Sequence, residues 1–173
     1  SDVCSSDLWC LKNKKRKHTI NFKSQKGLIK MLKGIPSILS PELLKILMEM
    51  GHGDEIVLGD GNFPAASNAD KLVRCDGHGI PELLDAILQL FPLDIYTDKP
   101  VALMEVVPGD DYDPVIWDKY EEIVAKYDED HTDFAHIERF DFYDRARDAY
   151  AIVATGEQAL YANVILKKGV VTD

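Results

Sequence analysis

Cysteine is scarce in this chain of 173 residues: it occurs three times, and only Cys75 lies beyond residue 30. A disulfide framework needs paired cysteines, so residues 31–173 have none, as is usual in a reducing compartment. The sequence also lacks HExxH and CxxC metal-binding elements, a GxSxG nucleophile motif and a glycine-rich phosphate loop. We therefore expect a cytoplasmic protein with no metal centre and no cofactor.

Positive charge is scarce beyond residue 30. The formal net charge is −10, yet residues 1–30 carry eight Lys and Arg against two Asp, or about +6. Residues 31–173 therefore carry about −16. Phosphate groups are bound by clustered cations. We thus expect residues 31–173 to bind neither nucleic acid nor an anionic membrane.

Residues 1–30 differ from the rest of the chain in pattern as well as charge. They contain no apolar run long enough for a membrane span or for the core of a signal peptide. Their KNKKRK cluster would suit nuclear import or nucleic acid, although such runs are frequent by chance. Apolar periodicity restarts at Met31. We interpret residues 1–30 as a leader foreign to the fold and residues 31–173 as one domain.

Helical and strand patterns alternate along residues 31–173. Apolar residues that recur three and four positions apart predict helices at 41–50, 80–91, 113–127 and 142–147. Short apolar or β-branched runs predict strands at 56–58, 72–75, 101–107, 136–140, 150–155 and 161–166. This alternation is typical of an α/β domain with helices on the faces of a sheet.

The segment 40–64 is the most informative part of the sequence. Ser40 and Pro41 are a good start for a helix, and Gly51 is a good end for it. His52 follows on a turn, and Asp60 comes where the next strand ends. Open α/β sheets bind ligands beyond the carboxyl ends of their strands, so we expect the two residues in one pocket. A surface histidine and a turn-capping aspartate fit the same sequence.

Other candidates lie nearer the carboxyl terminus. Arg139 in a predicted strand could point into a cleft, or could form a surface ion pair with a neighbouring acid. Tyr143 belongs to an aromatic cluster that equally fits core packing. Tyr161 and Asn163 share one face of the last predicted strand, where they could bind a polyol or satisfy a sheet edge. Together with the imidazole of His52 and the carboxylate of Asp60, these side chains suit an uncharged polar ligand such as a sugar.

A family resemblance adds to this interpretation. The chain contains, in order, LSPELL, MGHGDEIVLGD, NFPA, IPELLDAI, PLD, IERFDFYDRA, AIVATGE and YANVILKKGV. With these pieces, residues 31 to about 171 resemble the fucose mutarotase and ribose pyranase family, and its fucose branch most closely. The resemblance implies a three-layer αβα sandwich with a central mixed sheet. It also implies ring-shaped homo-oligomers, often decamers, with sites between subunits.

The resemblance further implies an isomerase that interconverts the anomers of a monosaccharide, L-fucose above all, without metal or cofactor. By matching motif positions, His52 is expected to be the principal acid/base group, with Tyr161 also catalytic. The residues expected to bind the sugar are Asp60, Arg139, Tyr143, Tyr161 and Asn163. Ring opening needs a proton on the ring oxygen and loss of one from the anomeric hydroxyl, and an imidazole suits such proton shuttling.

One position departs from the fucose branch. The chain has Ala162 in a Tyr-Ala-Asn sequence, which is the ribose pyranase form, where the fucose branch usually has Tyr-Gly-Asn. On a strand, Ala162 would point away from the two residues that flank it. Ribose pyranase activity is therefore an alternative. So is a non-catalytic sugar-binding ring protein that keeps the fold.

Overall fold

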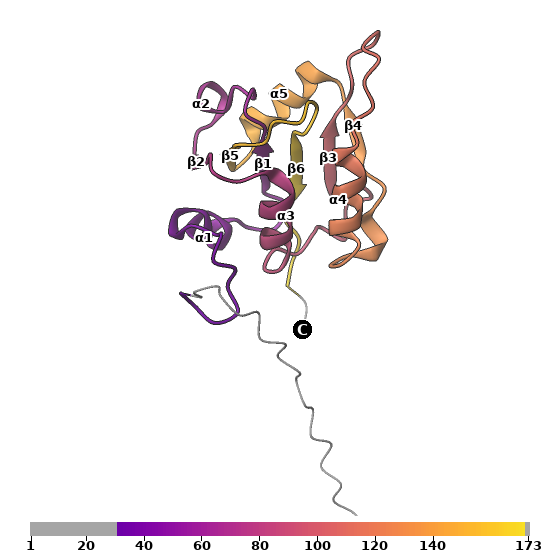
Figure 1. The fold of residues 1–173 in the computed structure, drawn as a ribbon. Coiled ribbons are helices and arrows are strands. Elements are labelled where there is room, and N and C mark those ends of the chain that lie inside the picture. The colour runs from indigo at the N-terminus through magenta and orange to yellow at the C-terminus, as the bar shows by residue number, and fades with distance from the viewer. Residues whose placement is uncertain (1–30, 172–173) are drawn as a thin grey trace, which may run out of the picture.

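A six-stranded mixed sheet in the order β2-β5-β1-β6-β3-β4 forms the centre of the structure, a computed structural model that describes residues 31–171 (Figure 1). The strands are β1 (Glu55–Gly59), β2 (Leu72–Cys75), β3 (Val101–Met104), β4 (Ala135–Ile137), β5 (Ala151–Thr155) and β6 (Val164–Lys167). The helices are α1 (Pro41–Glu49), α2 (Ala65–Asn68), α3 (Ile80–Leu88), α4 (Ile116–Val124), α5 (Arg139–Asp148) and the short 3-10 helix η1 (Glu129–His131). The predicted foreign leader lies outside the described residues.

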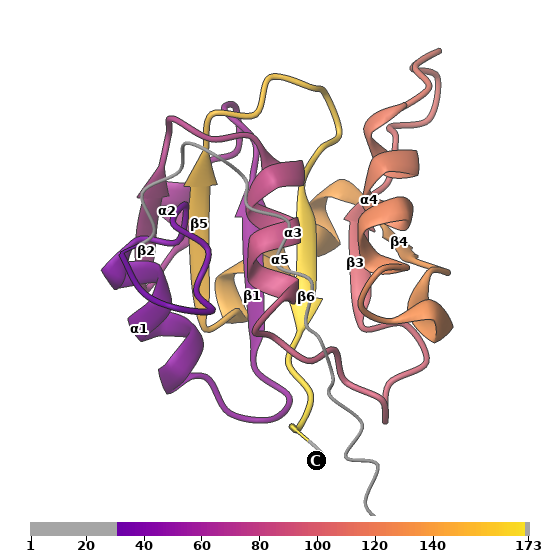
Figure 2. The ribbon, with the colours of Figure 1, turned by 60° about the horizontal axis from the view of Figure 1, so that its bottom comes forward.

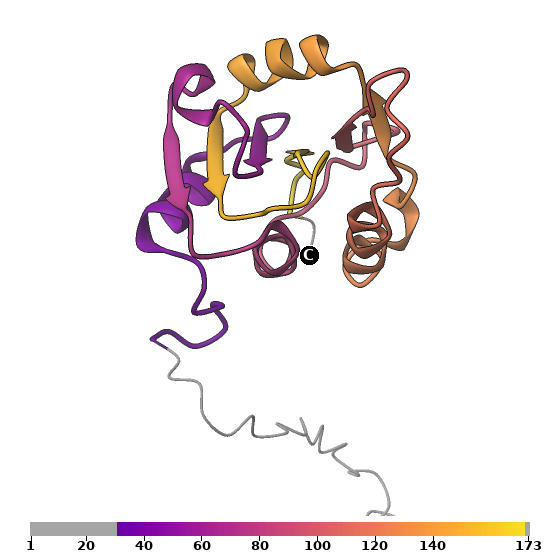
Figure 3. The same cartoon turned by 45° about the horizontal axis from the view of Figure 1, so that its top comes forward.

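Helices cover both faces of this sheet, which gives the three layers that were expected. One apolar cluster joins α1, α3 and α4 to Ile56 and Leu58 of β1. A second apolar cluster joins α2 and α5 to Val57, which lies between Ile56 and Leu58 in β1. Figure 3 shows α5 above the sheet and α3 with α4 below it. Because successive side chains of a strand point to opposite faces, a strand covered on both sides is apolar throughout.

The direction of β6 makes the sheet mixed. It runs antiparallel to β1 and β3, whereas β1–β5, β2–β5 and β3–β4 are parallel pairs. The arrows in Figure 2 show this reversal. The carboxyl ends of β1, β2, β3, β4 and β5 therefore meet at one end of the sheet, together with the amino end of β6.

Local signals placed the first helix correctly. The Ser40 hydroxyl oxygen accepts a hydrogen bond from the Leu43 amide at 3.1 Å, and Pro41 is the first helical residue. The buried residues Leu43, Ile46 and Leu47 lie at helical spacing on the face toward the sheet.

Three predicted strands are each three residues too long at one end, and the one predicted at 101–107 already ends at Met104. The strand predicted at 136–140 stops at Ile137, and Arg139 is the first residue of α5. The cause is Glu138, whose carboxylate accepts hydrogen bonds from the amides of Phe140 and Asp141 and so caps the helix. The strand predicted at 161–166 begins only at Val164.

Within residues 31–171, no helix has both the length and the apolar character that crossing a bilayer requires.

Candidate functional site

His52 and Asp60 lie at opposite ends of β1. His52 precedes the strand and Asp60 follows it, and a strand of five residues is roughly 17 Å long. The prediction that they flank one pocket is therefore wrong within a single chain. We call the two places the His52 end and the Asp60 end of the sheet.

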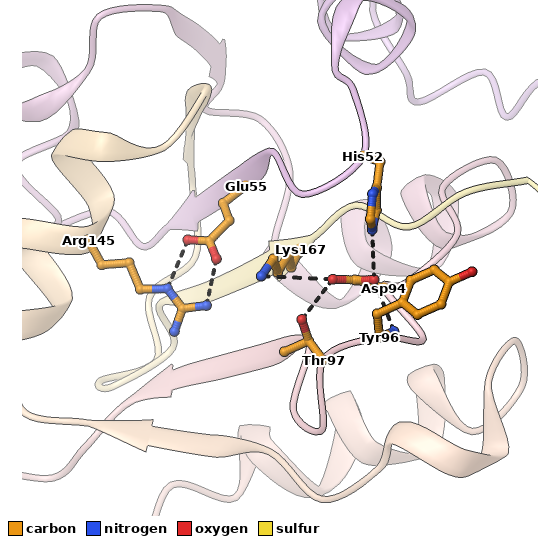
Figure 4. Close-up of polar contacts among 7 residues, drawn as sticks. All are labelled: His52, Glu55, Asp94, Tyr96, Thr97, Arg145 and Lys167. Atoms are coloured by element: carbon orange, nitrogen blue, oxygen red, sulfur yellow. Dashed lines mark hydrogen bonds and ion pairs between the residues drawn. The ribbon is translucent and has the colours of Figure 1, made fainter.

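At the His52 end, the imidazole contacts a buried carboxylate. Asp94 Oδ1 lies 3.1 Å from His52 Nε2 (Figure 4). The same oxygen accepts a hydrogen bond from the Tyr96 amide at 3.1 Å, while Oδ2 accepts one from the Thr97 hydroxyl at 2.7 Å. Lys167 Nζ lies 3.8 Å from Oδ2. Asp94 is thus fixed by its own loop and presents an oxygen to His52.

The surroundings of Asp94 keep it ionised. Burial by itself raises the pKa of this carboxyl, but hydrogen bonds from Thr97, the Tyr96 amide and His52 outweigh burial and lower the pKa to about 2. An ionised carboxylate only accepts hydrogen bonds, so His52 Nε2 carries a proton toward Asp94. In the tautomer with this proton on Nε2, the lone pair lies on Nδ1, and the side chain is 46% exposed.

Acid should weaken this arrangement. The folded-state pKa of Asp94 lies below the unfolded value, so ionised Asp94 stabilises the fold above about pH 4, and this contribution is lost as the pH falls toward 2. We expect the difference in unfolding free energy between the wild type and Asp94→Asn to shrink by about 1 kcal/mol between pH 6 and pH 3. Urea unfolding at both pH values measures it. The exposed Asp98→Asn is the control, and an equal pH dependence in both variants would contradict this role of Asp94.

The turn that carries His52 is tied to the end of β6. Lys168 accepts a hydrogen bond from the Gly53 amide at 2.8 Å and donates its own amide to the Asp54 carbonyl at 2.8 Å. Its Nζ donates to the Leu47 carbonyl in the last turn of α1 at 3.2 Å. Gly53 has φ 86°, a conformation that glycine adopts without strain. The backbone on both sides of His52 is therefore fixed.

At the Asp60 end, Asp60 and Asn163 form a reciprocal pair. The Asp60 amide donates to Asn163 Oδ1 at 2.8 Å, and Asn163 Nδ2 donates to Asp60 Oδ2 at 3.1 Å. The Asn62 amide donates to Asp60 Oδ1 at 2.9 Å. Burial raises the pKa of Asp60; these donors oppose the rise, and the nearby carboxylate of Glu157 adds to it.

A cavity of about 300 Å³ opens beside Asp60, at the carboxyl ends of β1, β2 and β5. Its lining includes the ring of Phe63 and the polar side chains of Ser67, Arg74 and Asp76. This volume is at the small end of the range for ligand pockets and is adequate for a monosaccharide.

The other predicted residues also belong to the Asp60 end. Tyr143 of α5 packs its ring 5.6 Å from that of Phe63, in the turn that follows Asp60. Arg139 follows the carboxyl end of β4, and its Nε is the one buried side-chain polar atom in residues 31–171 without a hydrogen-bond partner. The Tyr161 hydroxyl donates to Asp110 Oδ2 at 2.6 Å.

Tyr161 and Asn163 do not share a strand face, contrary to the prediction. Both precede β6, and Tyr161 has φ 55°. Asn163 turns toward Asp60, whereas Tyr161 turns toward Asp110. Ala162 between them is fully buried in the core, and its carbonyl accepts a hydrogen bond from the Tyr120 hydroxyl at 2.8 Å.

The sequence patterns assigned no role to Asp94. It lies 42 positions from His52, in a PLD sequence without local signs of a site.

Comparison with known proteins gives a consistent result. The model of the RbsD / FucU transport protein family matches residues 33–171. The L-fucose mutarotase of Actinobacillus pleuropneumoniae serotype 5b (strain L20) is 51% identical over 140 residues, which is 81% of this chain and 97% of the relative. The fucose mutarotase of Homo sapiens is 53% identical over 145 residues, with 80% and 94% covered.

Solved structures agree with these relatives. The fucose mutarotase of Streptococcus pneumoniae, in complex with L-fucose, superposes with a TM-score of 0.78 at 59% identity, covering 82% of this chain and all of the other. RbsD of Bacillus subtilis, complexed with D-ribose, has a TM-score of 0.60 at 20% identity, covering 78% and 95%, and shares the fold alone.

Proposed function

The chain belongs to the RbsD/FucU family, and from that premise we propose that it is an L-fucose mutarotase, an isomerase that interconverts the α and β anomers of the sugar. The observation that carries the proposal is the identity of 51–53% to fucose mutarotases, over nearly their whole length. The family model spans residues 33–171, a range that contains both ends of the sheet.

The proposed chemistry begins at His52. Asp94 holds the proton of Nε2, so Nδ1 can take the proton of the anomeric hydroxyl. The resulting imidazolium is stabilised by ionised Asp94 and can return a proton to the ring oxygen. Opening the ring by this route and closing it on the other face exchanges the anomers. Asp60, Asn163, Arg139 and Tyr143 would hold the sugar hydroxyls, as a set of acceptors, donors and an aromatic wall.

A complete site of this kind needs two copies of the chain. The acid/base group and the proposed sugar-binding groups are separated by the length of β1. Large apolar side chains are exposed at both ends: Ile95 and Tyr96 near His52, and Phe140 and Leu160 near Asp60. We infer that the His52 end of one copy meets the Asp60 end of the next. Head-to-tail contacts of this kind generate a ring where the rotation between neighbouring copies closes, and a ring is the form that the family resemblance implies.

Ring size and location stay predictions. A decamer is what the family resemblance implies. A cytoplasmic location rests on the scarcity of cysteine, with Cys75 a buried free thiol in the described residues.

The test is magnetisation-exchange NMR between the α and β anomers, with and without protein, for L-fucose, D-ribose and D-galactose. We expect acceleration for L-fucose. Exchange of ribose but not fucose would transfer the assignment to the ribose pyranase branch. The side chain of Ala162 is buried in the core, so the Tyr-Ala-Asn sequence does not by itself favour that branch. No acceleration for any sugar would overturn the enzymatic proposal.

A further inference from the structure

Tyr161 is held in place by the segment that leads into α4 and by α4 itself. The connection between β3 and α4, residues 105–115, projects beyond the sheet (Figures 1 and 2); we call it the arm. From the arm, Asp110 accepts the hydrogen bond of the Tyr161 hydroxyl at 2.6 Å, and the Tyr112 ring lies 5.7 Å from the Tyr161 ring. Trp117 in α4, just after the arm, donates its indole N–H to the Tyr161 carbonyl at 2.8 Å.

The backbone at Tyr161 needs such support. It is the one residue other than glycine with a positive φ, 55°, within residues 31–171. A bulky side chain in this conformation is uncommon and persists where the surroundings hold it. The Trp117 bond fixes its carbonyl, and the Tyr120 bond fixes the carbonyl of Ala162 next to it. The arm and α4 therefore determine where the phenol points.

The contact with Asp110 also determines what the phenol can do. A tyrosine hydroxyl has one proton to donate and two lone pairs that accept. Because the proton is directed at the Asp110 carboxylate, the oxygen offers only its lone pairs to any other group. A hydroxyl that donates to this oxygen would form a chain of hydrogen bonds ending on a carboxylate, and such chains strengthen one another.

We propose that Asp110 is a positioning residue for Tyr161, which it sets as a hydrogen-bond acceptor for a sugar hydroxyl. This inference rests on the proposed function, because it assumes that Tyr161 contacts the sugar. Asp110 itself does not touch the reacting atoms in this scheme. It acts through the orientation of the phenol and through its negative charge.

The charges around Tyr161 agree with an acceptor that stays protonated. The hydrogen bond to Asp110 raises the pKa of Tyr161, burial raises it further, and the guanidinium of Arg139 opposes the rise. The remaining acids of the arm, Glu105, Asp111 and Asp113, are exposed. Asp111 is the natural control, since it has the same side chain one residue away and makes none of the contacts with Tyr161 described above.

The experiment compares Asp110→Asn with Asp111→Asn. Asn keeps an acceptor oxygen but removes the charge, and a charge-assisted hydrogen bond is roughly twice as strong as a neutral one. We expect Asp110→Asn to lower kcat/KM for L-fucose anomer exchange about 5-fold to 10-fold. Asp110 is exposed, so both variants should fold and unfold like the wild type. Asp111→Asn should keep wild-type exchange.

Two further readouts separate positioning from a structural role. In Tyr161→Phe, the additional change Asp110→Asn should cause no further loss, because its effect passes through the phenol. NMR titration of ¹³C-labelled tyrosine, with Tyr161→Phe for assignment, should show the Tyr161 pKa falling in Asp110→Asn and unchanged in Asp111→Asn.

The outcomes are distinguishable. A wild type that neither binds a sugar nor accelerates its anomer exchange overturns the proposed function and, with it, the sugar contact of Tyr161. A wild type that is active, with equal rates in the two Asn variants, overturns the role of Asp110 alone. Additive losses in the double variant would also overturn it.

Discussion

Replacing His52 with glutamine is expected to slow the anomer exchange of L-fucose by about 100-fold or more, while the sugar still binds. General acid/base groups contribute roughly 10²–10⁴-fold to rate. Glutamine can still donate an N–H to Asp94, so the buried carboxylate keeps a partner. It cannot take up and return a proton near neutral pH. Magnetisation-exchange NMR measures the rate, and calorimetry measures sugar affinity.

His78→Gln is the matched control for this variant. His78 also contacts a carboxylate, with 2.9 Å between Nδ1 and Glu82 Oε1, and its side chain is 42% exposed against 46% for His52. Its loss should leave the exchange rate unchanged. If the His52 variant lost affinity in proportion to rate, His52 would be a binding group and not an acid/base group. If the wild type bound the sugar without accelerating exchange, the chain would be a binding module.

Patterns within one element were predictable from the sequence. Ser40 and Pro41 start a helix by their own chemistry, and the apolar run at Ile56–Leu58 is typical of a strand that is covered on both faces. The predicted stop at Gly51 was not met, because α1 ends at Glu49 with an extended cap at Met50, and the left-handed glycine of this turn is Gly53. These signals depend on neighbours in the chain, which the sequence displays directly. The order of the six strands and of the helices α1, α3, α4 and α5 followed from them, whereas no pattern predicted the short α2 and η1.

Features that depend on contacts between distant segments were not predictable. One local signal was missed as well: Glu138 is an unusual helix cap, so the predicted strand extended over Arg139. The positive φ of Tyr161 is supported by Trp117, 44 residues away, and no local residue announces it. The pairing of His52 with Asp94 likewise spans 42 positions. His52 and Asp60 were predicted to share a pocket because they flank one strand. That prediction did not allow for the length of the strand, which separates the two side chains.

That separation leads to a prediction with a numerical outcome. We expect His52→Gln and Asp60→Asn each to be nearly inactive alone, but to regain activity when the two variants are mixed in one ring. In a random equal mixture, half of the His52 ends and half of the Asp60 ends are intact, so about a quarter of the shared sites are whole. Exchange of L-fucose anomers should therefore return to about a quarter of the wild-type rate. The variants are co-expressed with different tags, purified through both, and measured by NMR.

The control mixture pairs His52→Gln with Asp94→Asn. Both changes damage the His52 end, so no contact between these copies contains an intact His52 end, and the rate should stay at the level of the single variants. Native mass spectrometry establishes that copies have mixed in both cases. A mixed ring of His52→Gln and Asp60→Asn without recovered exchange would show that His52 and Asp60 serve separate sites. Recovery in the control mixture would show that the His52–Asp94 contact is dispensable. We expect the exchange rate to recover in the first mixture alone, because the five-residue strand β1 carries one half of the site at each end.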